Sequence, residues 1–269
     1  MSAAHTVPPA RTSGPPTTPA SRMAALARAE LTLFVRSRST LVSALFVPLA
    51  LPLSVRSTVE QMHLKDTGLT VGLVILPAAL GFALLFAVYS PLVGVFVARR
   101  EQLVLKRLRT GEARDAEILT GAALPALVTG LAQSAILAVG CMALLHLPAP
   151  HAPLLAFLGL LLGLVLCAAL AAITARFTRT AESAQFSSLP LALVSVLGSG
   201  ITVPLELLPH RLAHWCELLP LTPVITLVRG GWSGELSTAE AFRALAVALV
   251  WTAGAVFAGA RWFRWEPRR

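Results

Sequence analysis

The chain has 269 residues, of which 56% are hydrophobic and 13% charged, a net charge of +9 and a mean hydropathy of +0.75. Soluble domains carry about 25% charged residues, and a water-soluble fold of this length could not hide so much apolar surface. The basic residues stand in short clusters between long apolar runs, so the charge does not indicate a nucleic-acid partner. The apolar runs lack strict alternation, so we expect an all-α integral membrane protein rather than a β-barrel.

The N-terminal segment 1–21 is rich in Pro, Thr, Ser and Ala, and we interpret it as a disordered cytoplasmic tail. It lacks the apolar core of a signal peptide, so we expect it to be retained. Residues 22–38 form a candidate interfacial helix, with the simpler alternative of a basic flank before the first span. We take 22–264 as one transmembrane domain and 265–269 as a basic cytoplasmic tail.

Six apolar segments approach or reach the length of about 17–25 residues that a transmembrane helix needs. They are 40–55, 69–98, 118–145, 154–175, 186–205 and 244–260. The first is short and holds two prolines, and Pro77 and Pro91 predict kinks in the second. Lys, Arg, Asp and Glu are absent from all six interiors.

The apolar segment 207–228, between the fifth and sixth spans, is interrupted by prolines and polar residues. We expect two short helices that enter and leave the membrane on the outer face, because the pieces are too short to span it. The residues that mark this re-entrant segment are Glu206, Pro209, His210, His214 and Trp215. The two histidines lie four apart, as in some metal sites, but we interpret them as the polar side of an interfacial helix and expect no metal.

The basic residues also predict the orientation. With the N-terminal tail, the loops after spans two and four and the C-terminus on one side, that side holds 17 of the 22 Lys and Arg residues. The positive-inside rule then places both termini in the cytoplasm.

No energy source is evident in the chain itself. Its only lysines, Lys65 and Lys106, do not follow glycine as the lysine of a phosphate-binding loop does. Ion-coupled carriers usually hold an ionisable group within the membrane, and the predicted span interiors offer none.

The loop 99–118 predicts a charged helix over 99–109, a stop at Thr110 and Gly111, and a short second helix from near Glu112. Such a loop could dock onto a soluble partner; the alternative is a solvated positive flank. The candidate contact residues are Leu105, Lys106, Arg107, Leu108, Arg109, Glu112 and Glu117. In the second span, Phe82, Phe86, Tyr89 and Phe96 lie at roughly helical spacing and could line an apolar path or simply pack against neighbouring helices.

Several stretches resemble one family. The run LKRLRT at 105–110, followed by AEIL at 116–119 and Gly121, is similar to the loop between the second and third spans of ABC-2 type permeases. The runs PLELLP at 204–209, LPLTP at 219–223 and VRG at 228–230 resemble the same family between spans five and six. These permeases are membrane subunits of bacterial ABC exporters, including drug-resistance and daunorubicin-type exporters. The run TGEAR at 110–114 departs from the proline or serine that many relatives carry there.

The resemblance implies a permease in the bacterial inner or plasma membrane that pairs with itself or a similar subunit and with two separate ATP-binding subunits. ATP and Mg²⁺ would bind those partners, so this chain would carry neither cofactor nor catalysis. The loop 105–117 would contain the coupling helix, 22–38 the connecting helix and 207–219 the re-entrant outer helices. The alternative is a stand-alone secondary carrier or a membrane assembly factor. The substrate class stays open among drugs, a self-made antibiotic, lipids and polysaccharides.

Overall fold

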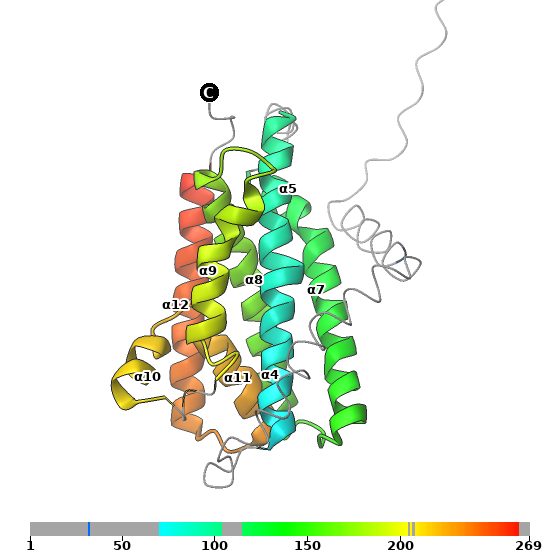
Figure 1. The fold of residues 1–269 in the computed structure, drawn as a ribbon, viewed down its shortest axis with the longest axis vertical. Helices are drawn as coiled ribbons and strands as arrows, with labels where there is room; N and C mark the ends of the chain where they lie inside the picture. Colours follow the sequence, from blue (N-terminus) through cyan, green and yellow to red (C-terminus); the bar gives the residue numbers. More distant parts are fainter. Residues whose placement is uncertain (1–31, 33–69, 104–114, 204, 206–207, 264–269) are drawn as a thin grey trace, which may run out of the picture.

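The computed structural model describes residues 32, 70–103, 115–203, 205 and 208–263 of the chain. Every regular element in these residues is helical (Figure 1). In chain order the elements are α4 (Val71–Ala83), the π-helix η2 (Leu84–Tyr89), α5 (Ser90–Glu101), α7 (Asp115–Leu145), α8 (Pro153–Phe177), α9 (Ala184–Gly198), α10 (His210–Glu217), α11 (Thr222–Ser233) and α12 (Thr238–Trp262).

Four helical stretches in the described part of the chain are long and apolar enough to cross a membrane. They are Val71–Glu101, Glu117–Leu145, Pro153–Phe177 and Thr238–Trp262. They coincide with the second, third, fourth and sixth predicted spans, which confirms a multi-pass membrane protein. The fifth prediction corresponds to the shorter apolar helix α9. The tails, the candidate interfacial helix and the first span lie outside the described residues, so the total of six stays a prediction.

The second span runs through α4, η2 and α5 as one helical rod (Figure 1). Pro77 lies inside α4, and Pro91 lies in the first turn of α5. Just before Pro91, the Ser90 N–H donates to the carbonyl of Leu85, five residues back. Proline cannot donate to the helical ladder and its ring crowds the preceding turn, so a wider turn relieves the crowding without ending the helix.

The helix ends sort into two groups. The ends of α5, α8 and α12 and the starts of α7 and α9 lie towards one end of the bundle, at the top of Figure 1. The loops 146–152 and 234–237 lie at the other end. This agrees with the grouping of loops predicted from the basic residues. Which end faces the cytoplasm stays a prediction.

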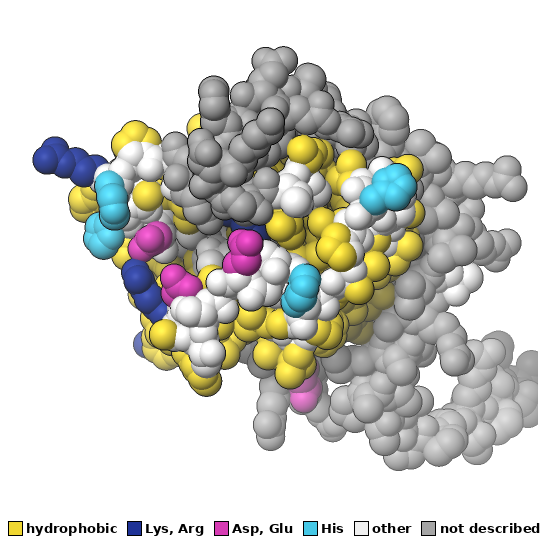
Figure 2. Space-filling view, turned by 90° about the horizontal axis from the view of Figure 1, so that it is seen from below, with side chains coloured by type: hydrophobic (Ala, Val, Ile, Leu, Met, Phe, Trp, Pro, Cys, Tyr) yellow, Lys and Arg dark blue, Asp and Glu magenta, His cyan; other side chains and the backbone are white. Residues whose placement is uncertain are grey.

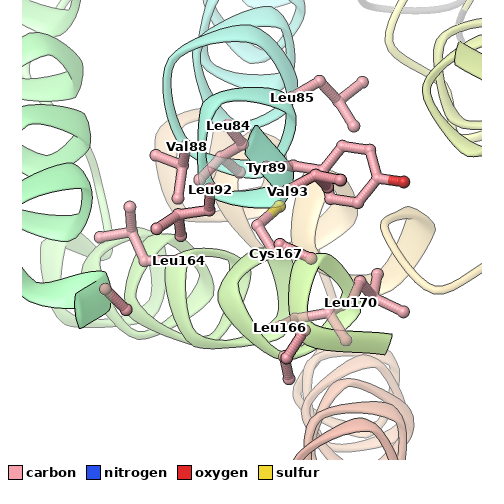
Figure 3. Packing of buried hydrophobic residues seen from close by; sticks show 14 of the residues in the cluster. Leu84, Leu85, Val88, Tyr89, Leu92, Val93, Leu164, Leu166, Cys167 and Leu170 are labelled. Atoms are coloured by element: carbon pink, nitrogen blue, oxygen red, sulfur yellow. The ribbon is translucent and has the colours of Figure 1, made fainter. Parts of the chain in front are cut away.

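Helix α8 is the centre of the packing. It lies against α11, α12, α5 and η2, and Figure 3 shows Leu84, Val88 and Leu92 close to Leu164 and Cys167 of α8. Membrane helices associate closely where small residues meet. Along the contact with α11, an added Cβ at Gly159 would lie 2.8 Å from the Leu227 side chain.

Large apolar side chains remain exposed on the bundle's outer surface. The most exposed on α7, α9 and α12 are Val139, Leu144, Phe186, Leu197, Phe242, Val250 and Phe257. Figure 2 views the end that carries loops 146–152 and 234–237, where charged and histidine side chains appear among apolar ones. Apolar sides of this extent are a liability in water and suit contact with lipid or with another membrane subunit.

Candidate functional site

The end of α5 determines how the chain enters the predicted coupling segment. The helix ends at Glu101; the Gln102 N–H donates to the Ala98 carbonyl and the Leu103 N–H to the Arg100 carbonyl. Leu103 then adopts a left-handed backbone with φ 56°. The prediction of one charged helix over 99–109 is therefore wrong. A left-handed residue at this position ends the helix, as a glycine usually does.

Arg100, in the last turn of α5, is fully buried. Its Nη1 donates to the Ala175 carbonyl at 2.8 Å, and its Nη2 donates to the Thr178 carbonyl at 2.6 Å and the Arg179 carbonyl at 3.4 Å. These acceptors lie at the C-terminal end of α8, where unsatisfied carbonyls concentrate partial negative charge. Arg100 is thus an interior link between two helices, whereas the sequence predicted it as part of the charged loop 99–118.

Neighbouring contacts strengthen this junction. The Glu101 carboxylate accepts a hydrogen bond from the Ala181 N–H at 3.3 Å. Arg100 and Glu101 therefore both contact the segment between α8 and α9, Arg100 through the Thr178 and Arg179 carbonyls and Glu101 through the Ala181 N–H. The end of α5 is fixed to the start of this linker.

Two pairs of hydroxyl groups join the middle of the second span to its neighbours. The Tyr89 hydroxyl lies 3.0 Å from Thr174 Oγ1 of α8, and Ser90 Oγ lies 2.9 Å from Ser188 Oγ of α9. Tyr89 is completely buried, and Figure 3 shows its ring among the apolar side chains of the core. Buried hydroxyls need such partners.

The four aromatic residues predicted as a possible path fall into two environments. The rings of Phe82 and Phe86 stack at 5.9 Å, and Phe86 is 45% exposed. Phe96 is buried and meets the ring of Phe263 edge-on at 5.8 Å. With Tyr89 bonded to α8, the structure does not bring the four onto one surface. Their contact with a substrate stays a prediction.

The segment 207–228 contributes to two short helices, α10 and α11, as predicted, but they differ in environment. Helix α10 begins after Pro209 and buries none of its residues; His210 and His214 are exposed, and Trp215 is 70% exposed. Helix α11 is buried along nearly its whole length between α8, α4 and α12. Glu206 lies outside the described residues, and re-entry of the segment stays a prediction.

The described residues contain no cluster of three or more His, Cys, Asp or Glu side chains that could hold a metal ion. On α10, the carboxylate of Glu217 is 2.9 Å from Arg243 of α12, in an exposed ion pair. This contact joins α10 to the start of α12. An exposed pair of this kind contributes little to stability.

The sequence also missed a second buried cation. Arg229 of α11 is 7% exposed, and its Nη2 donates to the Gly200 carbonyl at 2.9 Å. Gly200 follows the end of α9 and has φ 71°, a conformation that glycine adopts readily. The positive-inside grouping places Arg229 on the side with fewer basic residues and does not predict its burial. The signal was its position directly after the mostly apolar stretch 224–228 and before two glycines, which is typical of a packed helix.

The sequence matches the family described as ABC-2 type transporter over residues 22–232, which is most of the chain. The chain belongs to the ABC-2 type transporter family. No individually curated protein matches it. Membership makes the chain a membrane permease component of an ABC transporter, in agreement with its apolar helices. The ABC-2 match ends within α11, so α12 lies beyond it.

In this ABC-2 permease the predicted coupling residues from Leu105 to Glu112 lie outside the described residues. Glu117 lies in the first turn of α7, exposed, and its carbonyl accepts a hydrogen bond from Thr120 Oγ1 at 3.2 Å. The helix that carries the third span already includes Asp115. The final residues of the predicted coupling loop are therefore a direct extension of a membrane helix, rather than part of a separate short helix.

Proposed function

We propose that the chain is the membrane-spanning subunit of an ATP-driven exporter, forms the substrate path and couples it to a separate ATP-binding subunit. The observation that carries the proposal is the ABC-2 family match over residues 22–232. ATP and Mg²⁺ bind the partner, because this chain has no lysine in a phosphate-binding loop. Two permease subunits, identical or similar, complete the path. Both termini lie in the cytoplasm.

The segment 104–114 is the proposed contact with the ATP-binding subunit. It connects α5 to α7, whose adjoining ends lie at the end of the bundle that is at the top of Figure 1. Leu105 and Leu108 are three residues apart, so on a helix they share a face and can fill an apolar groove. Interface energy concentrates in such buried anchors, while charges at the rim contribute less.

Replacing both anchors tests this contact. The double variant Leu105→Asp and Leu108→Asp should insert normally but lose co-purification with the ATP-binding subunit, because losing a buried anchor costs about 2 kcal/mol or more. Hydrolysis of ATP that depends on the permease should disappear with it. The matched control, Lys106→Gln with Arg107→Gln, changes charges within the same segment and should keep both properties.

The measurement is a pull-down together with an ATPase assay on the pair reconstituted in lipid. If the double aspartate variant binds the ATP-binding subunit and stimulates hydrolysis like the original chain, the segment is a solvated positive flank and the coupling assignment is wrong. If the original chain itself never binds an ATP-binding subunit, the exporter assignment is wrong.

A stand-alone secondary carrier is the other candidate, and Arg229 bears on it. This buried cation is an ionisable group inside the bundle, as a carrier would need. However, a guanidinium remains protonated in proteins, so it cannot relay protons. Its hydrogen bond to the Gly200 carbonyl gives it a structural partner. These properties favour an ATP-driven subunit over a proton-coupled carrier.

A further inference from the structure

Two arginines, in the last turns of α5 and α8, each donate to the C-terminal end of another helix. Arg100 of α5 donates to the carbonyls of Ala175, Thr178 and Arg179 at the end of α8. Arg176, in the last turn of α8, donates from Nη1 to the carbonyl of Trp262 at the end of α12, at 2.8 Å. The two contacts form a series from α5 to α8 and from α8 to α12.

The first contact has the properties of a stiff link. Arg100 is fully buried, so water does not compete for the three carbonyls. Its planar fork presents several donors in fixed directions, which a flexible single ammonium does not. The acceptors belong to the negative end of a helix, which favours a cation. Glu101 holds the Ala181 N–H beside it, so the end of α5 cannot pivot about a single bond.

The second contact is less protected. Arg176 is half-buried, and its bond to Trp262 is exposed to solvent. It nevertheless reaches the last residue of α12, the long helix that α8 contacts along much of its length. Helix α7, at the other end of the segment 104–114, lies less extensively against α8 than α5 does. The link therefore runs from α5 through α8.

We propose that Arg100 and Arg176 are positioning residues that make α5, α8 and α12 move as one body at the end of the bundle where the segment 104–114 leaves α5. This role rests on the proposed function, because the movement comes from an ATP-binding subunit that contacts this segment. A displacement of α5 then reaches α12 through two sets of arginine–carbonyl hydrogen bonds. The outer end of α12 responds to nucleotide at the opposite end of the bundle.

Distances between spin labels test the links directly in the full chain in lipid nanodiscs. Cysteines at Gln102 and Phe177 report on α5 and α8, and cysteines at Phe177 and Arg261 report on α8 and α12; all three side chains are exposed. Cys216 is replaced by serine, while Cys141 and Cys167 are buried. Both pairs should give narrow distance distributions, without nucleotide and after trapping with ATP and vanadate.

Each link should fail separately. Arg100→Gln should broaden the distribution of the first pair, and Arg176→Gln that of the second. Arg100→Lys should broaden the first pair less, because an ammonium can still donate to one carbonyl. The matched control is Arg99→Gln, the half-buried neighbour of Arg100. Unchanged distributions in both glutamine variants overturn the proposal. If Arg100→Gln does not accumulate as folded protein, Arg176→Gln carries the test, since its contact is exposed.

A second readout separates linkage from simple stability. A cysteine at the exposed Glu235, just before α12, is labelled by a maleimide with and without ATP and vanadate, in the presence of the ATP-binding subunit. In Arg100→Gln the nucleotide-dependent change in labelling rate should shrink about twofold to thirtyfold, the usual range for a coupling residue. Co-purification of the ATP-binding subunit should persist.

The outcomes distinguish the two proposals. Loss of stability alone lowers the yield but leaves the response of the folded molecules intact, and that result overturns the linkage. A normal response in Arg100→Gln that still binds the ATP-binding subunit overturns the linkage and leaves the exporter assignment standing. Absence of any binding to the original chain overturns the exporter assignment, and the transmission role falls with it.

Discussion

Gly231 of α11 lies closer to α8 than any other residue type allows. A Cβ built at Gly231 would lie 2.6 Å from the backbone nitrogen of Ala156 and 2.9 Å from its Cα. The Gly231 carbonyl also accepts a hydrogen bond from the Ala152 N–H at 2.9 Å, at the start of α8. The substitution Gly231→Ala should therefore force the two helices apart at the end of the bundle that carries loops 146–152 and 234–237.

The size of the effect follows from what the new methyl group meets. Non-bonded carbon atoms prefer separations of about 3.5–4.0 Å, so α8 and α11 would have to move apart by about 1 Å to make room for the methyl group. Neighbouring contacts between the two helices would then open by a similar distance and lose roughly a quarter to a half of their attraction. The obstacle is backbone, so no change of rotamer can relieve it. Overpacking of this kind lowers the free energy of unfolding by about 1–3 kcal/mol. The higher helix propensity of alanine offsets at most about 1 kcal/mol of this loss.

The assay is unfolding of the purified chain by titration with a denaturing detergent. The matched control is Gly254→Ala on α12, where an added Cβ meets nothing within 4 Å. We expect a lower midpoint for Gly231→Ala and an unchanged or higher midpoint for Gly254→Ala. Equal midpoints for the two variants would refute the close-contact argument, because both changes add the same methyl group to a helix.

Three further outcomes are expected. Arg229→Gln should lower the free energy of unfolding by about 1–3 kcal/mol, because the Gly200 carbonyl loses its buried donor; the exposed Arg211→Gln should not, and equal unfolding of the two would contradict this. Leu103→Gly should raise the free energy of unfolding by about 1 kcal/mol, since glycine adopts φ 56° without the steric penalty of a side chain. A decrease in the free energy of unfolding would instead show that the Leu103 side chain makes a stabilising contact. Cysteines at Thr110 and Ser233 should be labelled from opposite sides of the membrane, and labelling from one side would reject the six-span topology.

The long spans were predictable because an apolar run of about 20 residues has few physical solutions. The third and fourth predicted spans begin at 118 and 154, and the candidate spans in the structure begin at Glu117 and Pro153. The prolines around the outer segment likewise predicted its division into α10 and α11. The long spans and the proline breaks depend on local composition alone, so they can be inferred directly from the sequence.

The tertiary positions of the arginines were not predictable in the same way. Arg99 and Arg100 are adjacent and chemically identical, yet only Arg100 faces the end of α8 and is fully buried. The environment of each depends on the angle at which a helix 75 residues further along the chain ends beside α5. Leu103 was missed for another reason: its left-handed backbone has none of the glycine or asparagine that usually signals such a turn.

Both buried arginines of the described residues meet the same kind of acceptor, at opposite depths of the bundle. Arg100 binds carbonyls at the end of α8, and Arg229 binds the carbonyl of Gly200 just beyond the end of α9. A helix that ends inside a membrane bundle leaves carbonyl groups that neither lipid nor its own turns can satisfy. A guanidinium on a neighbouring helix satisfies several of them and keeps its own charge partnered. In this permease Arg100 and Arg229 therefore each bind two parts of the bundle together, although in the sequence they stand beside apolar runs as the basic residues at a lipid headgroup boundary do.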